Sequence, residues 1–113
     1  MAGPKPLMWL HGEIKTPPFS KEARVEAGTL LRMLQEGQSI GLPESRPMPA
    51  IGVHCHELRV TDERAEWRIV DRIDEDAIVI VEIFPKKEQK TAKRIIEKCQ
   101  KRLREYDRTA EDS

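Results

Sequence analysis

The stretch from 77 to 84, AIVIVEIF, constrains the fold of this chain more than any other part of the sequence. Apolar residues occupy both the odd and the even positions of this stretch. Because successive side chains of a strand point to opposite faces, such a strand is stable only when other layers cover both faces of its sheet. The stretch therefore predicts a central strand that is covered on both sides.

Two further β-like runs precede this strand, at 53–60 and 66–73. Short polar segments at 61–65 and 74–76 separate the three runs, and connections of this length join neighbouring antiparallel strands. We therefore predict an antiparallel meander over residues 53–84.

Helical patterns lie on either side of this region. Ser20 is a good N-cap, and the apolar residues after it repeat at helical spacing until Gly37. A second helix is predicted after Pro85, with a basic outer surface. Gly28 would weaken the first helix by about 1 kcal/mol, and a close contact between helix and sheet would explain its presence. The two predicted apolar stripes consist of Ala23, Ala27, Leu30, Leu31 and Leu34, and of Ala92, Ile95, Ile96, Cys99, Leu103 and Tyr106.

The remaining segments complete one small α+β domain. Residues 7–10 are predicted as a short strand, and residues 38–52 as an irregular loop with polyproline character. The expected fold is an N-terminal strand and helix packed on a twisted antiparallel sheet, followed by the basic C-terminal helix. The 113 residues leave no room for a second full hydrophobic core. We expect a flexible tail at 1–6, the domain at 7–107 and a frayed tail at 108–113.

The amino-acid composition indicates the compartment and the kinds of partner to expect. Charged residues make up 35% of the chain, and no stretch has the roughly 20 consecutive apolar residues that a membrane helix requires. We expect a cytoplasmic protein with no membrane partner. The two cysteines, Cys55 and Cys99, have no metal-ligand spacing and are expected to be reduced. We predict no metal and no cofactor.

The net charge of zero conceals a strong separation of charge along the chain. Residues 61–83 hold 3 basic and 8 acidic side chains, whereas residues 84–113 hold 10 basic and 6 acidic ones. A concentrated basic stripe is typical of proteins that bind a phosphate-rich partner. A solvated helix surface with no such partner explains the stripe equally well.

Six short motifs, in this order, resemble the phage-derived, HigB-like branch of the RelE/ParE toxin superfamily. They are LHGEIKTPPFS at 10–20, LLRMLQEGQ at 30–38, SRPMP at 45–49, HELR at 56–59, WRIV at 67–70 and FPKK at 84–87. The resemblance spans roughly residues 7–107. It implies a small RelE-like domain that acts as the toxin of a type II toxin–antitoxin pair. It also implies a ribosome-dependent endoribonuclease that cleaves messenger RNA, and a small helix-turn-helix DNA-binding antitoxin that neutralises it.

Metal-free cleavage of RNA needs a base for the 2′-hydroxyl, cations for the phosphorane and an acid for the leaving oxygen. Arg68 matches the family's sheet arginine and is the candidate cation for the scissile phosphate, because a guanidinium can hold two phosphate oxygens. Its structural alternative is an ion pair with Glu57 or Asp71. Lys86 and Lys87 resemble the family's basic pair at the edge of the site, although a solvated turn would also contain them.

Strand 53–60 carries further candidates. Arg59 shares one face with Glu57, which could orient Arg59, act as the base, or form a structural ion pair, the commonest role of such a residue. His54 and His56 are predicted on the opposite face, where an imidazole could move a proton or simply pack or be solvated. They do not suggest a metal site, because no third ligand follows at a recognisable spacing.

Asp71 departs from the superfamily, many members of which have a tyrosine at this position. The carboxylate is a general base, a salt-bridge partner or the sign of an impaired site, because it would repel a phosphate. The only tyrosine of the chain is Tyr106. The residues expected to bind RNA are Arg46, Arg72, Lys90, Lys93, Arg94 and Lys98.

Two other functions remain open at this stage. The protein could be a non-catalytic or gyrase-inhibiting ParE-like homologue that mainly binds its antitoxin. Alternatively, it could be a phage or mobile-element protein whose basic helix binds nucleic acid without cleaving it.

Overall fold

A computed structural model describes residues 3–10, 19–63, 65–87 and 90–112. Five strands and two helices follow one another in these parts of the chain and confirm the predicted α+β class. They are β1 (Leu7–Trp9), α1 (Lys21–Gln35), β2 (Ser45–Pro47), β3 (Cys55–Thr61), β4 (Glu66–Ile73), β5 (Ile78–Pro85) and α2 (Lys93–Asp112).

The strands form one mixed sheet in the order β1-β5-β4-β3-β2. The predicted antiparallel meander of β3, β4 and β5 is confirmed. The sheet is not antiparallel throughout, however, because β1 runs parallel to β5. A parallel neighbour requires a crossover instead of a tight hairpin, and α1 lies in the long connection after β1.

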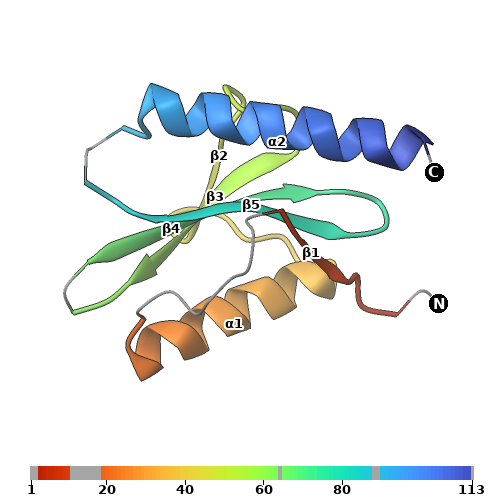
Figure 1. The fold of residues 1–113 in the computed structure, drawn as a ribbon. Coiled ribbons are helices and arrows are strands. Elements are labelled where there is room, and N and C mark those ends of the chain that lie inside the picture. Colours follow the sequence, from red (N-terminus) through yellow and green to blue (C-terminus); the bar gives the residue numbers. More distant parts are fainter. Residues whose placement is uncertain (1–2, 11–18, 64, 88–89, 113) are drawn as a thin grey trace.

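The two helices cover opposite faces of the sheet (Figure 1). On β5, Ile78 and Ile80 contact the apolar cluster under α1, whereas Val79 and Val81 contact the cluster under α2. All four side chains are completely buried. The prediction that this strand is covered on both sides is therefore confirmed, and the domain has three layers with two small cores.

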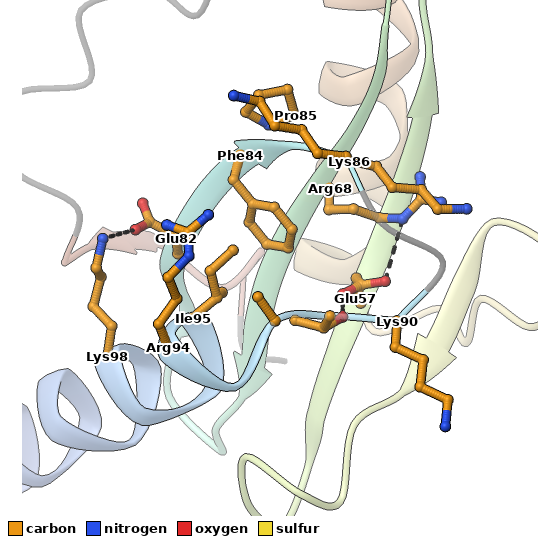
Figure 2. Close-up of a pocket in the computed structure, with 13 residues that line it drawn as sticks. Glu57, Arg68, Glu82, Phe84, Pro85, Lys86, Lys90, Arg94, Ile95 and Lys98 are labelled. Carbon is orange, nitrogen blue, oxygen red and sulfur yellow. Dashed lines mark hydrogen bonds and ion pairs between the residues drawn. The ribbon is translucent and has the colours of Figure 1, made fainter.

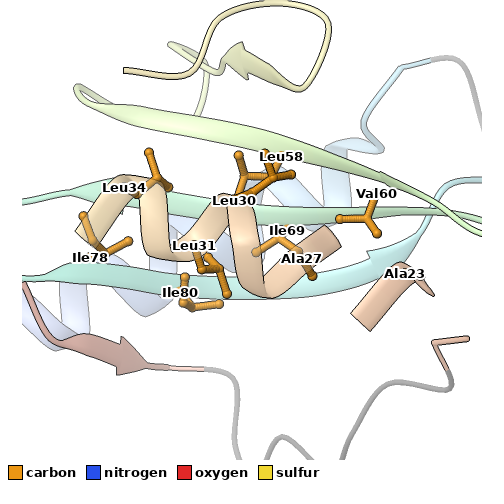
Figure 3. Close-up of a cluster of buried hydrophobic side chains, with 10 residues drawn as sticks. All are labelled: Ala23, Ala27, Leu30, Leu31, Leu34, Leu58, Val60, Ile69, Ile78 and Ile80. Carbon is orange, nitrogen blue, oxygen red and sulfur yellow. The ribbon is translucent and has the colours of Figure 1, made fainter. Parts of the chain in front are cut away.

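Helix α1 forms as its sequence predicts. The Ser20 side chain accepts a hydrogen bond from the backbone N–H of Ala23, and the predicted apolar stripe faces the sheet (Figure 3). Gly28 differs from the prediction. It is exposed, and a Cβ at this position would meet nothing within 4 Å, so no close helix–sheet contact explains the glycine.

A β-bulge in β5 changes which side chains face α2. Val70 of β4 lies opposite Glu82, but the next residue, Asp71, lies opposite Ile80. Val81 is therefore the extra residue, and the alternation shifts by one position at this point. As a result Glu82 points to the α2 face, where it is buried.

Helix α2 buries the predicted stripe, with Ile95, Cys99 and Leu103 at its centre. The helix continues to Asp112, so residues 108–112, which the sequence predicts as part of a tail, belong to α2. Two interactions hold this end. The Thr109 hydroxyl donates to the Glu105 carbonyl, and the Asp107 carboxylate accepts two hydrogen bonds from Arg72 of β4.

The segment 38–52 is more ordered than the predicted irregular loop. It contains β2, which pairs with β3 and places Arg46 opposite Glu57. Met48 and Ile51 are buried against the α2 face of the sheet. None of the helices in the parts that the structure describes is long and apolar enough to cross a membrane.

Candidate active site

A cavity of about 200 Å³ lies between the sheet and the beginning of α2 (Figure 2). Strands β3, β4 and β5 form its floor, and residues from 85–87 and 90–98 form its wall. It is lined by Glu57, Arg68, Glu82, Phe84, Pro85, Lys86, Lys87, Lys90, Thr91, Ala92, Arg94, Ile95 and Lys98. Six of these side chains are cationic and two are carboxylates, so the cavity favours an anionic ligand.

Arg68 lies at the floor of the cavity and is only 4% exposed. Its Nε lies 3.2 Å from Glu57 Oε1, its Nη2 lies 3.2 Å from Glu66 Oε2, and its Nη1 donates to the Trp67 carbonyl. The predicted ion pair with Glu57 is thus present, whereas Asp71 is not a partner. Two carboxylates already balance the charge of this guanidinium.

Glu57 is buried and held at both carboxylate oxygens. Arg68 contacts Oε1, and the Thr91 hydroxyl donates to Oε2 over 2.5 Å. Thr91 comes just before α2, so this bond fixes the start of the helix to the centre of the sheet. Sequence reasoning did not identify Thr91, because a single threonine before a helix resembles an ordinary cap.

Glu82 is the second carboxylate of the cavity and was also missed. It contacts Lys98 Nζ at 3.3 Å and Arg102 Nη1 at 3.2 Å (Figure 2 shows the lysine contact). Glu82 could have been identified from the sequence, because it is the only acidic residue in the apolar stretch AIVIVEIF and a charged group in a covered strand needs a partner. Which face it would occupy was not predictable, since the bulge at Val81 decides that.

The rim of the cavity brings together most of the predicted basic residues. Lys87, Lys90 and Arg94 are exposed and form no ion pair with any residue that the structure describes. Lys86 lies 3.7 Å from Glu66 and points to the same side of the cavity as Arg68 (Figure 2). These four cations can turn toward an incoming phosphate without breaking a buried ion pair.

Arg59 lies next to this cavity, on the same face of the sheet. It is directly opposite Arg68 in the register of β3 and β4. It lines a neighbouring hollow of about 330 Å³ together with Glu26, Pro43, Glu44, Thr61, Glu66, Arg68 and Lys86.

His56 and Asp71 lie on the other face of the sheet, toward α1, and do not reach the cavity. Their side chains approach one another to 3.7 Å, and burial raises the pKa of Asp71 well above its ordinary value. Asp71 therefore balances neither Arg68 nor Arg72, both of which point to the α2 face. His54 is not in a strand at all: it occupies an exposed turn with φ of 63° before β3, so the predicted histidine pair is not formed.

Three predicted RNA-binding residues lie apart from the cavity. Arg72 is bound to Asp74 and Asp107 and lies over the Tyr106 ring at 5.8 Å, and its hydrogen bond with Asp107 raises its pKa. Arg46 is exposed on the edge strand β2. Lys93 is 89% exposed and lies 3.8 Å from Glu97 on the outer surface of α2.

Within the described ranges, no group of three histidine, cysteine, aspartate or glutamate side chains is arranged to hold a metal ion. Of the six motifs noted in the sequence, those at 56–59, 67–70 and 84–87 contribute residues to the cavity. Most of the motif at 10–20 falls on residues 11–18, outside the described residues.

Most of the chain matches a known protein family. The sequence model of the family described as "Phage derived protein Gp49-like (DUF891)" matches residues 17–104. This region includes α1, the strands β2 to β5 and most of α2, and with them every residue of the cavity. No curated protein matches the chain.

Proposed function

This chain belongs to the family of phage-derived Gp49-like proteins, and from that premise we propose that it is the toxin of a type II toxin–antitoxin pair. The proposal places it in the HigB-like branch of the RelE/ParE superfamily and gives it the activity of a ribosome-dependent endoribonuclease acting on messenger RNA. The cavity beside α2 carries the proposal, because its excess of cations around a buried arginine and a buried carboxylate suits a phosphodiester.

The proposed reaction needs no external reactant beyond the RNA. The 2′-hydroxyl loses its proton to the Glu57 carboxylate, and its oxygen attacks the neighbouring phosphorus. The bond between phosphorus and the 5′-oxygen breaks, and the leaving oxygen takes a proton from a lysine ammonium of the rim, Lys86 or Lys87. The products are a 2′,3′-cyclic phosphate and a 5′-hydroxyl.

Stabilisation of the phosphorane is assigned to the cations around Glu57. Arg68 contributes from the floor of the cavity, while Lys90 and Arg94 approach from the side of α2. Groups held in place before the reaction stabilise developing charge most effectively, and the three bonds of the Arg68 guanidinium provide such an arrangement. Trp67 does not stack on the RNA in this proposal, since it contacts Phe19 on the other face of the sheet, and Phe84 is the aromatic side chain that lines the cavity. The proposal assigns the positioning of the RNA strand to the ribosome.

One observation favours a second function. The Arg68 guanidinium is only 4% exposed, and Glu57 and Glu66 already occupy it, so it has less capacity to bind a phosphate than a free arginine. The alternative is a non-catalytic or gyrase-inhibiting homologue that keeps the fold and mainly binds its antitoxin.

Induced expression separates the two functions. The wild type should arrest growth and produce new 5′ ends within translated messenger RNA. The double variant Lys90→Gln/Arg94→Gln should lose at least about tenfold in cleavage, because each charge-assisted contact to a phosphate contributes about 1 kcal/mol or more. Both side chains are exposed, so the variant is expected to fold.

The matched control is Lys21→Gln/Arg24→Gln, which removes the same two charges from the exposed surface of α1. It should cleave as the wild type does. Arrest without new RNA ends would favour a gyrase-type target. No arrest, at an expression level confirmed by immunoblot, would favour a protein that only binds its antitoxin.

A further inference from the structure

The cavity and the second hollow adjoin one another, and the second hollow also reaches Glu26 of α1. Arg68 and Lys86 line both of them, so the boundary between the hollows consists of cationic side chains. The second hollow lies over the ends of β3 and β4 and has a volume of about 330 Å³. No residue of α2 lines this second hollow, which remains open to a ligand beside the first.

Arg59 is placed at an energetic cost to the sheet. It stands directly opposite Arg68 across the antiparallel pair, and like charges in this position destabilise a sheet. Arg68 is offset by Glu57 and Glu66, but the Nε of Arg59 is buried without a hydrogen-bond partner among the described residues.

The acidic side chains of the second hollow do not remove this charge. Glu26 and Glu44 line the hollow but form no ion pair with Arg59, and Glu66 is bound to Arg68 and Lys86. The Nε is enclosed, so the terminal Nη groups are the donors that face a ligand, and no ion pair with a described residue occupies them. A planar group with several N–H donors suits a phosphate, whose oxygens it can hold two at a time.

We propose that Arg59 and Lys86 form a second anion subsite, which holds the phosphate next to the one that is cleaved. This inference rests on the proposed function and gives the RNA strand a course across the sheet. A strand whose scissile phosphate lies over Arg68 must place its next phosphate nearby, because every nucleotide carries one. Arg59 is therefore a binding residue that does not touch the reacting atoms.

The test measures the affinity of short RNA analogues that cannot be cleaved. The probes are a 2′-O-methyl uridine dinucleotide with one internal phosphodiester and the same dinucleotide with an added 5′- or 3′-terminal phosphate. For the wild-type protein, the second phosphate should tighten binding about fivefold to tenfold in isothermal titration calorimetry. In Arg59→Gln this gain should fall below about twofold, and Arg59→Lys should keep part of it.

The matched control is Arg32→Gln, which removes an exposed arginine from α1 on the opposite face and should keep the whole gain. A wild-type gain that Arg59→Gln retains would overturn the subsite, and so would the absence of any gain or of any binding. If the protein cleaves RNA on ribosomes but the second phosphate gives no gain in affinity that depends on Arg59, only the subsite is overturned. If the gain in affinity depends on Arg59 but the protein cleaves no RNA, the subsite is supported and the proposed nuclease activity is overturned.

Discussion

Asp71 is a buried carboxylate at an unfavourable position. It is completely buried on the α1 face of the sheet, and neither of its carboxylate oxygens has a hydrogen-bond partner among the described residues. The Nδ1 of His56 lies 3.7 Å from one of these oxygens. An ionised carboxylate in such surroundings is unfavourable, and burial accordingly raises its pKa well above the ordinary value.

The pH dependence of stability should report this carboxylate. Because the pKa of Asp71 is raised in the folded state, its contribution to stability is fully present below the unfolded pKa of about 3.9 and is lost as the pH rises through the folded pKa. The variant Asp71→Asn does not show this decrease in stability with rising pH. Its free energy of unfolding relative to the wild type should rise between pH 4 and pH 8, by about 1.4 kcal/mol for each tenfold difference in proton affinity.

Urea unfolding at several pH values provides the measurement. Asp74→Asn is a matched control, since it removes a carboxylate that is bound to Arg72 instead of being isolated. Parallel pH profiles for the wild type and Asp71→Asn would contradict the prediction.

Gly28 offers a gain in stability at a single position. Its backbone is helical, it is exposed, and an added Cβ meets no atom within 4 Å. Gly28→Ala should therefore stabilise the protein by about 1 kcal/mol, through better helix propensity and a less flexible unfolded chain. Thermal unfolding checks this, and an unchanged or lowered melting temperature would show that the glycine has a contact of its own.

At the scale of elements, α2 is attached to the sheet by polar bonds near both ends. Thr91 binds Glu57 before the first turn, and Asp107 binds Arg72 near the last turns. Between these points the apolar stripe packs on β5. The polar bonds thus hold the parts of the helix that hydrophobic contact secures least.

Removal of the distal bond should loosen only the end of α2. In Asp107→Ala, amide hydrogen exchange should become faster over residues 104–112, while exchange in β4 and β5 stays unchanged. The exposed neighbour Glu111 provides the control, as Glu111→Ala should leave the exchange pattern as it is. Faster exchange throughout the sheet would show instead that the bond supports the whole domain.

The same bond has a predictable dependence on pH. The hydrogen bond from Arg72 lowers the pKa of Asp107. The bond is therefore fully present above the ordinary carboxyl pKa and is lost as the pH falls through the lowered one.

Helices and strands were predictable from the sequence wherever the apolar residues follow a single spacing. The stripe of α1 and the doubly apolar strand β5 were recognisable because burial on a helix and on a covered strand imposes different spacings. The sequence could not reveal the bulge at Val81, since one extra residue in an apolar strand leaves the composition unchanged. Edge strand β2 was hidden for a related reason: its three residues include a proline, which disfavours strands in general but is tolerated at an edge.

The candidate site was predictable in part. Arg68, Lys86 and Lys87 were identified by motif, and the pairing of Arg68 with Glu57 by charge. The position of Thr91 beside Glu57 depends on how the chain after β5 folds back over the sheet. No local sequence pattern shows this. The predicted strand position of His54 was wrong, because β3 begins only at Cys55. His54 itself lies in the turn before the strand and has a positive φ.

At the scale of the whole molecule, two separate cores lie on either side of one sheet. Both cysteines belong to the core under α2. Burial raises the pKa of Cys55 to about 11 and that of Cys99 to about 12. Since the thiolate is the reactive form, both thiols are protected for as long as α2 covers the sheet.

Alkylation should consequently follow global unfolding. In native buffer at pH 8, both cysteines should react with iodoacetamide at least about a hundredfold more slowly than in urea, and mass spectrometry should show them labelled together. Rapid labelling of the cysteines in native buffer would indicate that α2 separates from the sheet while the rest of the domain remains folded. A variant such as Glu111→Ala, altered at the exposed end of α2, should protect both thiols equally well.

The position of α2 after all five strands also determines when the cavity can exist. A nascent chain leaves the ribosome from its N-terminus, so Glu57 and Arg68 emerge well before Lys90, Thr91 and Arg94. Until α2 has emerged and docked, Glu57 lacks its threonine partner and the cavity lacks one wall. A chain synthesised only as far as β5 therefore contains the floor of the site without its wall, and the complete constellation appears only after α2 has emerged.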